Sequence, residues 1–329
     1  MGILKVGLIG LGRHGMRYAR HLLAPHPPAK LVAVCRRNAQ EGLAFAQAHH
    51  LRFYQDPHAL IADPDIDAVL VVTVPSLNVT IAEDAIRRRK PLLIEKPLTV
   101  TAQEARRLTE LATRASVPVM TAHTLRYDAA IGELKAHAPL LGPWRYLVLT
   151  ARMEHRPHSS EEVRAWNGRG ALLEIGIHLL DLVRFMTGER VREVNCELER
   201  PVPGAPEDRG WVRLTTTSAR VCMVDVSRVS GTRTTRVEIV GEHGQGLADW
   251  SASTVQLRTR SGETLSRTLP PTPTIVSVIQ AFCHAVETGA TMPITAYDGW
   301  RAVELAEACY RSAERGHPVQ LPREDERDD

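Results

Sequence analysis

The first part of the chain contains the pattern that most constrains its fold. Residues 3–9 form a short apolar run, and Gly10, Gly12 and Gly15 follow in the spacing GxGxxG before a helix-like segment at 16–23. This order of strand, glycine loop and helix is typical of a dinucleotide-binding βαβ unit. There the first glycine permits a tight turn, the second lets the backbone approach a pyrophosphate, and the third allows close helix–strand packing. We therefore predict a dinucleotide-binding domain in which the phosphates meet the helix N-terminus.

The first third of the chain continues this alternation of strands and helices. Strands are predicted at 30–35, 51–54, 68–73, 91–94 and 118–121, and helices at 39–50, 81–88 and 101–115. The strand at 68–73 is apolar until its end, as expected for a strand buried on both faces of a parallel sheet. We predict an α/β fold with a doubly wound parallel sheet, the Rossmann arrangement, over residues 1–122.

The pattern changes after residue 122. A helix near 129–136 and a strand at 144–154 precede six strand-like segments at 192–199, 211–217, 220–227, 233–240, 246–249 and 254–260. Turn-rich breaks separate these segments, and two helices at 275–288 and 297–316 follow them. This indicates a second, α+β domain over residues 123–322 with a large open, mainly antiparallel sheet, ahead of a charged tail at 323–329.

Residues 172–181 form a strongly apolar segment that carries three ionisable side chains. Glu174, His178 and Asp181 recur at i, i+4 and i+7, which places them on one stripe of an α-helix. Buried ionisable groups are costly unless they are paired or used. The stripe favours the wall of an active site, and the alternative is a hydrogen-bonded Glu–His–Asp chain that only orients the helix.

Composition excludes several classes of protein. The net charge is +3 with 24% charged residues, and no basic block indicates a nucleic-acid partner. The longest apolar runs are too short to cross a bilayer, and the chain opens directly into a strand without the pattern of a signal peptide. The five cysteines form no CxxC pair, and no histidine–cysteine cluster has the spacing of a zinc site. We expect reduced thiols, a cytoplasmic location, no metal and no membrane partner.

Several short motifs support a relationship to a known family. Glu95-Lys96-Pro97 follows a predicted strand, and the segments 123–127, 168–181, 240–244 and 310–316 follow in order. Together with the glycine loop, these motifs make the chain resemble the Gfo/Idh/MocA oxidoreductases, the glucose–fructose oxidoreductase and inositol dehydrogenase family, over essentially its whole length.

The resemblance implies a nicotinamide cofactor in the first domain and oligomerisation through the open sheet of the second, hence a homodimer or homotetramer. It implies small-molecule substrates such as sugars, polyols and inositols, and it assigns catalytic roles to Lys96, Glu174 and His178. Glu174 stands where the family usually has an aspartate, and Asn78 stands in a loop at 74–78 where a histidine is common. The residues expected at the cofactor are Gly10, Gly12, Arg13, His14, Gly15, Arg36, Arg37, Thr73, Pro75, Asn78, Glu95 and Lys96.

The choice of cofactor follows from the end of the second predicted strand. An NAD enzyme needs a carboxylate there for the ribose hydroxyls, but this chain has Arg36 followed by Arg37. A guanidinium matches phosphate geometry, so the sequence favours NADP, with its 2′-phosphate, over NAD. The alternative is that both arginines lie on a surface turn and NAD is bound without discrimination.

The expected reaction moves a hydride between the nicotinamide and a secondary alcohol or ketone. His178 suits the proton relay, Lys96 would polarise the oxygen, and Glu174 would set the tautomer of His178 or bind a substrate hydroxyl. The substrate pocket is predicted to include Arg126, Tyr127, Arg152, Glu154, His155, Trp166 and Asp181. The alternative for Arg126 is an ion pair between the domains, and the alternative for Trp166 is packing in the core.

Two other functional classes are compatible with the sequence. One is a non-catalytic sensor that binds NADP(H) and reports redox state to a partner. The other is a hydrolase or epimerase that uses a bound cofactor for transient oxidation. Net turnover of free NADP(H) separates a dehydrogenase from both.

Overall fold

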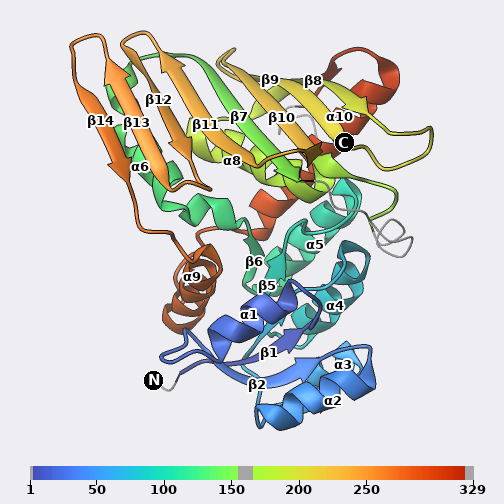
Figure 1. The fold of residues 1–329 in the computed structure, drawn as a ribbon. Coiled ribbons are helices and arrows are strands. Elements are labelled where there is room, and N and C mark those ends of the chain that lie inside the picture. Colours follow the sequence, from blue (N-terminus) through green and yellow to red (C-terminus); the bar gives the residue numbers. More distant parts are fainter. Residues whose placement is uncertain (1–2, 155–165, 323–329) are drawn as a thin grey trace. The chain divides into compact units, whose positions relative to one another are not determined.

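The structure of the protein is a computed structural model, and it describes residues 3–154 and 166–322 (Figure 1). It consists of two compact units, residues 1–124 with 273–301 and residues 125–272 with 302–329. The first boundary lies two residues from the predicted one. However, residues 273–301 were predicted in the second domain and belong to the first unit. The reason is that helix α9 (Thr274–Thr288) contacts α1 and β6, and Thr295 bridges to Met120 at the edge strand β6.

The first unit is built on a six-stranded parallel sheet in the order β3-β2-β1-β4-β5-β6. This order and the parallel pairing confirm the predicted Rossmann arrangement. All residues of the central strands β4 and β5 are buried, which explains why β4 is apolar throughout and β5 is apolar up to Glu95. The strands are β1 (Lys5–Ile9), β2 (Lys30–Cys35), β3 (Arg52–Tyr54), β4 (Ala68–Val71), β5 (Leu92–Glu95) and β6 (Val119–Ala122).

The helices of this unit begin at recognisable signals. The helix α5 (Ala102–Ala115) starts after Thr101, whose side chain accepts from the Glu104 backbone N–H in a capping box. The helix α4 (Pro75–Arg87) begins six residues before the predicted start, because Pro75 occupies the first turn, where a proline is favourable. Most of the segment predicted as a loop at 74–78 is therefore helical. The others are α1 (Gly15–Leu22), α2 (Ala39–Ala48) and α3 (Pro57–Ala62).

The second unit contains a nine-stranded sheet in the order β14-β13-β12-β11-β7-β10-β9-β8-β15. Among the pairs in this sheet, β7 and β10 run parallel and the others antiparallel, which confirms the predicted mainly antiparallel sheet. The strands are β7 (Trp144–Glu154), β8 (Val191–Glu199), β9 (Arg209–Thr216), β10 (Val221–Ser230), β11 (Thr234–Gly241), β12 (Gly244–Asp249), β13 (Thr254–Thr259), β14 (Thr264–Thr268) and β15 (Val319–Gln320). The polar edge strand β14 and the two-residue β15 were not predicted.

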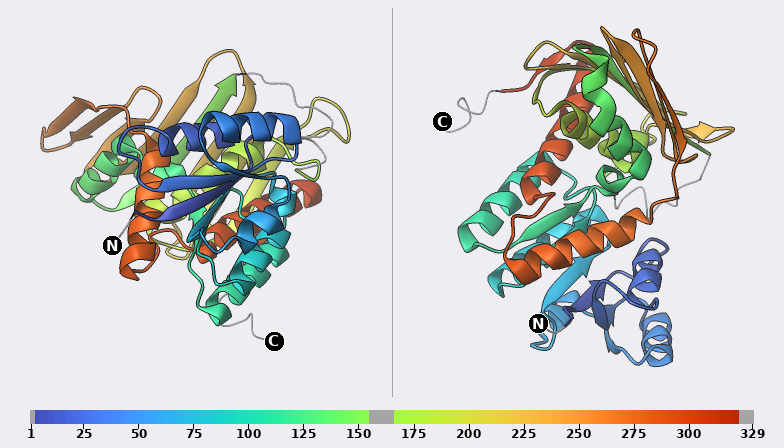
Figure 2. Two further views of the ribbon diagram at one scale, coloured as in Figure 1. Left: turned by 90° about the horizontal axis from the view of Figure 1, so that it is seen from below. Right: turned by 90° about the vertical axis from the view of Figure 1, so that its left-hand side faces the viewer.

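Helices of the second unit pack on one face of this sheet (Figures 1 and 2). The helix α6 (Ala129–His137) contacts β12 and β13, and α8 (Ile177–Thr187) contacts β7 and β10. Buried residues such as Leu149 and Val224 face these helices. The opposite face carries the alternate residues, and there Tyr146, Trp211 and Met223 are 41%, 42% and 38% exposed. We call this the open face. The remaining elements are η1 (Thr124–Tyr127), η2 (Ala138–Leu141) and α10 (Ala296–Arg315), which begins in the first unit and continues in the second.

Residues 172–181 were predicted to form one α-helix, and this prediction is wrong. Leu172–Gly176 forms a π-helical turn, here η3, and α8 begins at Ile177. A π-turn has i→i+5 hydrogen bonds and is wider than an α-turn, so the expected α-helical spacing from Glu174 to His178 does not apply. His178 and Asp181 both lie in α8 and still share one side of the helix. Such π-turns occur frequently at functional sites.

No helix in the described ranges is long and apolar enough to cross a membrane.

Candidate active site

The glycine loop after β1 has the close backbone packing that its sequence predicts. Gly10 has a φ of +101°, and a Cβ there would collide with the carbonyl oxygen of Val72. A Cβ at Gly15 would collide with the carbonyl oxygen of Gly10, which brings the start of α1 against the loop. A Cβ at Gly12 would meet nothing within 4 Å. Gly10 and Gly15 thus allow close backbone packing within the loop, and the space at Gly12 is open, as the binding of a pyrophosphate requires.

Glu95, the last residue of β5, is held from three sides. Its Oε1 accepts from Tyr18 Oη at 2.8 Å and lies 2.7 Å from His14 Nε2, and its Oε2 accepts from the Lys96 backbone N–H at 2.9 Å. Burial raises the pKa of Glu95, but the hydrogen bond and charge of His14, the charge of Lys96 and the Tyr18 hydroxyl together lower it below its ordinary value. Glu95 is only 6% exposed, so its main effect is to fix the backbone at Lys96.

The chain after Lys96 is fixed by Asn78. The Lys96–Pro97 peptide bond is cis. Asn78 Nδ2 donates to the carbonyl oxygens of Pro97 and Leu98, each at 3.2 Å, and Asn78 Oδ1 accepts from Thr73 at 2.9 Å. Asn78 was predicted to contact the cofactor from a loop, but it is 1% exposed in α4 and has little surface to offer a ligand. Its place in the structure is that of a positioning residue beneath Lys96.

Arg36 lies beside the glycine loop. Its guanidinium donates to the carbonyl oxygen of Leu11 at 2.7 Å and pairs with the carboxylate of Glu41 in the first turn of α2. Arg37 and Arg13 are exposed. A guanidinium at this position can meet an anion near the loop. Glu41 adds a carboxylate five residues after Arg36 and was not among the predicted site residues.

In the second unit, Arg126 and Asp181 bind each other. Arg126 Nε and Nη2 donate to the two carboxylate oxygens of Asp181 at 2.8 and 2.6 Å. Asp181 is 1% exposed, and the Arg126 guanidinium lies 5.5 Å from the ring centre of Phe185. Arg126 thus forms an ion pair, but this pair joins η1 to α8 within the second unit and is not the ion pair between domains that was the alternative for Arg126. These two side chains therefore fix α8 rather than stand open for a substrate.

Glu174 and His178 are half-buried, on η3 and α8 respectively. Tyr127 directly follows Arg126, and its hydroxyl is buried without a hydrogen-bond partner among the described residues. Burial raises the pKa of Tyr127 to about 12, so this hydroxyl keeps its proton at neutral pH. Trp166 is half-buried in a turn, and His155 lies outside the described residues.

Arg152 and Glu154 do not lie on the helix-covered face. Both are exposed on β7, and they alternate with Leu149 and Ala151, which face the helices. Arg152 pairs with Asp225, and Glu154 Oε2 lies 3.0 Å from Arg233 Nη2. Because successive strand residues point to opposite faces, both side chains lie on the face of the sheet opposite the helices, and their part in a substrate pocket stays a prediction.

Glu207 is a buried residue that the sequence analysis missed. It is fully buried, and its Oε1 accepts from Gly170 N, Leu172 N and the Tyr310 hydroxyl. Its place in a turn-rich segment between two strands gave no sequence signal for burial.

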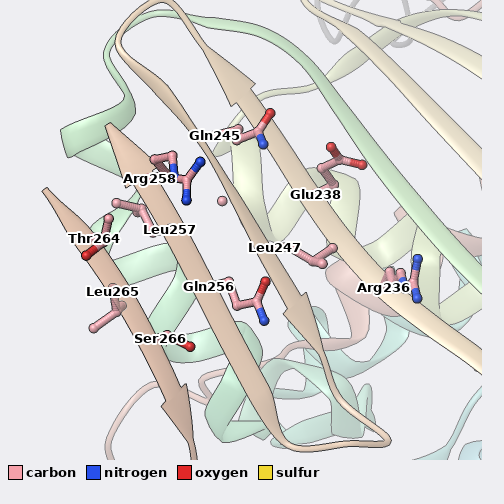
Figure 3. A pocket seen from close by; sticks show the side chains of 11 residues that line it. Arg236, Glu238, Gln245, Leu247, Gln256, Leu257, Arg258, Thr264, Leu265 and Ser266 are labelled. Carbon is pink, nitrogen blue, oxygen red and sulfur yellow. The ribbon is translucent and has the colours of Figure 1, made fainter. Parts of the chain in front are cut away.

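The open face also has a depression of about 560 Å³ over β11 to β14 (Figure 3). Arg236, Glu238, Gln245, Gln256 and Arg258 contribute side chains to it. It contains none of the predicted site residues. Among the described residues, no group of three or more His, Cys, Asp or Glu side chains is placed to hold a metal ion.

Comparison with known proteins supports the assignment of a family. A model described as "Oxidoreductase family, NAD-binding Rossmann fold" matches residues 4–123, and the "GFO/IDH/MocA C-terminal domain" matches residues 140–246. An inositol 2-dehydrogenase of Paracoccus denitrificans is 30% identical over 336 residues, covering 95% of both chains. The chain belongs to the Gfo/Idh/MocA family of oxidoreductases.

Two proteins of Thermotoga maritima are also similar over nearly the full chain. The myo-inositol 2-dehydrogenase of Thermotoga maritima is 28% identical over 339 residues, covering 97% of this chain and 98% of that protein. The crystal structure of a probable dehydrogenase from Thermotoga maritima has a TM-score of 0.84 at 26% identity, covering 96% of this chain and 98% of its own. The predicted resemblance is confirmed, and the first unit is an NAD-binding Rossmann domain of an oxidoreductase.

Proposed function

We propose that this oxidoreductase is an NADP-dependent dehydrogenase that oxidises a secondary alcohol, or reduces the ketone, of an inositol, another polyol or a sugar. The observation that carries the proposal is the anchoring of Lys96 at the carboxyl end of β5. Ligands of open parallel sheets bind beyond the carboxyl ends of the strands, and the glycine loop follows β1 at the same edge. The similar inositol dehydrogenases of Thermotoga maritima and Paracoccus denitrificans supply the substrate class.

The residues of the first unit fit a dinucleotide. The open space at Gly12 and the uncapped N-terminus of α1 would hold the pyrophosphate. The Arg36 guanidinium, held next to Leu11, would bind a 2′-phosphate in place of the carboxylate that NAD enzymes use. When bound, the nicotinamide exchanges a hydride with the substrate carbon.

In this proposal, three side chains of the protein act on the substrate. Lys96 orients the substrate oxygen and stabilises negative charge on it, because Glu95 and Asn78 fix the backbone on either side of its Cα. His178 takes or returns the proton of that oxygen. We assign this exchange to Nε2, because His178 Nδ1 is buried. Glu174 would orient the imidazole or bind a neighbouring hydroxyl.

The assembly and the compartment are also proposals. Tyr146, Trp211 and Met223 leave apolar surface on adjacent strands of the open face, which is typical of a surface buried against a second copy. We infer a homodimer or a homotetramer. The five cysteines are buried free thiols, which fits a reducing compartment such as the cytoplasm.

The proposed function is tested by following NADP and NAD reduction at 340 nm with a panel of inositols, linear polyols, aldoses and sugar acids. Substrate-dependent, multiple-turnover formation of NADPH is expected. Tight binding of NADP without turnover of any compound would favour a sensor. Conversion of a substrate without net change in the cofactor would favour an epimerase or hydrolase.

A further inference from the structure

Glu207 joins two segments that are far apart in the sequence. Its Oε1 accepts from the backbone N–H groups of Gly170 at 2.9 Å and Leu172 at 3.0 Å, and from the Tyr310 hydroxyl at 2.7 Å. The Glu207 carbonyl oxygen accepts from Ala171 N at 2.9 Å. Three consecutive backbone N–H groups are thus bound by one residue, and a tyrosine from α10 contacts the same carboxylate oxygen.

These N–H groups belong to the start of the η3–α8 helix. The first N–H groups of a helix have no partner within it, and no side chain caps this helix from its own N-terminus. A carboxylate at such an end satisfies the N–H groups and interacts favourably with the helix dipole. A fully buried carboxylate is otherwise unfavourable, so its donors explain why it is tolerated here.

Tyr310 is held as a hydrogen-bond donor. Burial, followed by the charge and hydrogen bond of Glu207, raises the pKa of Tyr310 well above its ordinary value. The Arg169 guanidinium lies 3.8 Å from the centre of the Tyr310 ring and fixes the ring from its face. Arg169 is the residue before Gly170, so both contacts of Tyr310 act on the same short segment.

A continuous backbone connection leads from Glu207 to Glu174. The Gly170 carbonyl oxygen accepts from Glu174 N at 2.9 Å. The Gly170 backbone is therefore hydrogen-bonded to Glu207 through its N–H group and to Glu174 through its carbonyl oxygen. Gly170 lies so close to Glu207 that a Cβ would collide with the Glu207 backbone. The π-turn begins two residues later, at Leu172, and His178 follows in α8. A displacement of Gly170 would therefore be transmitted to the backbone of the π-turn.

We propose that Glu207 and Tyr310 are positioning residues that set the π-turn and thereby the placement of Glu174 and His178. Their importance for catalysis rests on the proposed function, whereas their effect on the helix start does not. The proposal also gives a role to Tyr310, the first residue of the segment 310–316 that supports the family resemblance.

The test compares Tyr310→Phe with Ser312→Ala. Both variants remove a buried hydroxyl from α10, since Ser312 Oγ accepts from Cys196 N and donates to the His317 carbonyl oxygen. Only Tyr310 contacts Glu207, so Ser312→Ala is a matched control for lost stability. Glu207→Gln is the second variant, because it keeps an acceptor oxygen at Oε1 but removes the charge.

Three measurements are made on the full-length protein. Hydrogen exchange of peptides covering residues 170–172 should become about fivefold faster in Tyr310→Phe and Glu207→Gln. In Ser312→Ala, exchange of these peptides should change only as much as the lower free energy of unfolding of the whole protein requires. The His178 imidazole resonance, identified by its loss in His178→Gln, should titrate at a changed pH in the first two variants only. If a substrate is turned over, kcat should fall about tenfold with the Kd for NADP unchanged.

The proposal is overturned if Ser312→Ala changes exchange and titration as much as Tyr310→Phe, because the role would then be only structural. It is also overturned if neither Tyr310→Phe nor Glu207→Gln alters them. Failure of the proposed function is seen separately, as absence of turnover in the wild type, and leaves the exchange and titration results decisive.

Discussion

The account of Asn78 makes a prediction about stability. Asn78→Ala removes three hydrogen bonds, two buried ones donated to the carbonyls of Pro97 and Leu98 and a partly buried one accepted from Thr73. At about 1 kcal/mol for each, the loss is about 3 kcal/mol. Alanine is the better helix former by about 0.5 kcal/mol, which leaves a destabilisation of about 2.5 kcal/mol. The stability of the fold should therefore fall by this amount.

Urea denaturation of the purified protein measures this effect, and NADP titration measures binding on the same samples. Thr80→Ala is the control, because Thr80 lies in the same helix and its exposed hydroxyl donates to the Leu77 carbonyl oxygen. That variant should stay within about 0.5 kcal/mol of the wild type. If Asn78→Ala weakened NADP binding while its stability remained that of Thr80→Ala, Asn78 would be a cofactor contact and our assignment would be refuted.

Three further predictions concern the cofactor, acid stability and assembly. The Kd for NADP should be at least about tenfold below that for NAD, with Arg36→Asp shrinking or reversing the difference in calorimetric titrations; equal affinities in the wild type would contradict this. The lowered pKa of Glu95 implies stability that is fully present above the ordinary pKa of a glutamate and lost as pH falls through the folded value. The stability difference between wild type and Glu95→Gln should therefore shrink in acid, and a difference independent of pH would refute it. Light scattering at micromolar concentration should show a dimer or tetramer that Trp211→Glu dissociates, whereas a wild-type monomer would exclude an interface on the open face.

Local sequence patterns predicted most of the first unit because its strands are buried on both faces. β2 was predicted with its observed bounds, since an apolar run between turn residues has few alternatives in an α/β pattern. The start of α4 was missed because Pro75 was taken as part of a loop, although proline is favourable in the first helical turn. The place of α9 depends on contacts with α1 and β6, which no local pattern encodes.

The site was predictable where motifs carry it and less so where it depends on long-range contacts. Glycine spacing predicted the tight backbone at Gly10 and Gly15, because only glycine fits there. The π-turn was not predictable, because the same i, i+4, i+7 pattern is compatible with a regular α-helix. The alternation of β7 was evident in the sequence, but which face the helices cover was not. Glu207 is buried only because two distant segments donate to it.

The central proposal is that Lys96 and His178 act on one substrate oxygen. It is tested most directly by measuring NADP reduction by Lys96→Ala and His178→Ala on the best substrate of the panel, together with the Kd for NADP. Lys30→Ala, which removes an exposed lysine at the start of β2, is the control. Both active-site variants should lose roughly a hundredfold or more in kcat and keep the wild-type Kd for NADP within about threefold, while the control remains active. Turnover within about threefold of the wild type in either active-site variant would contradict the claim.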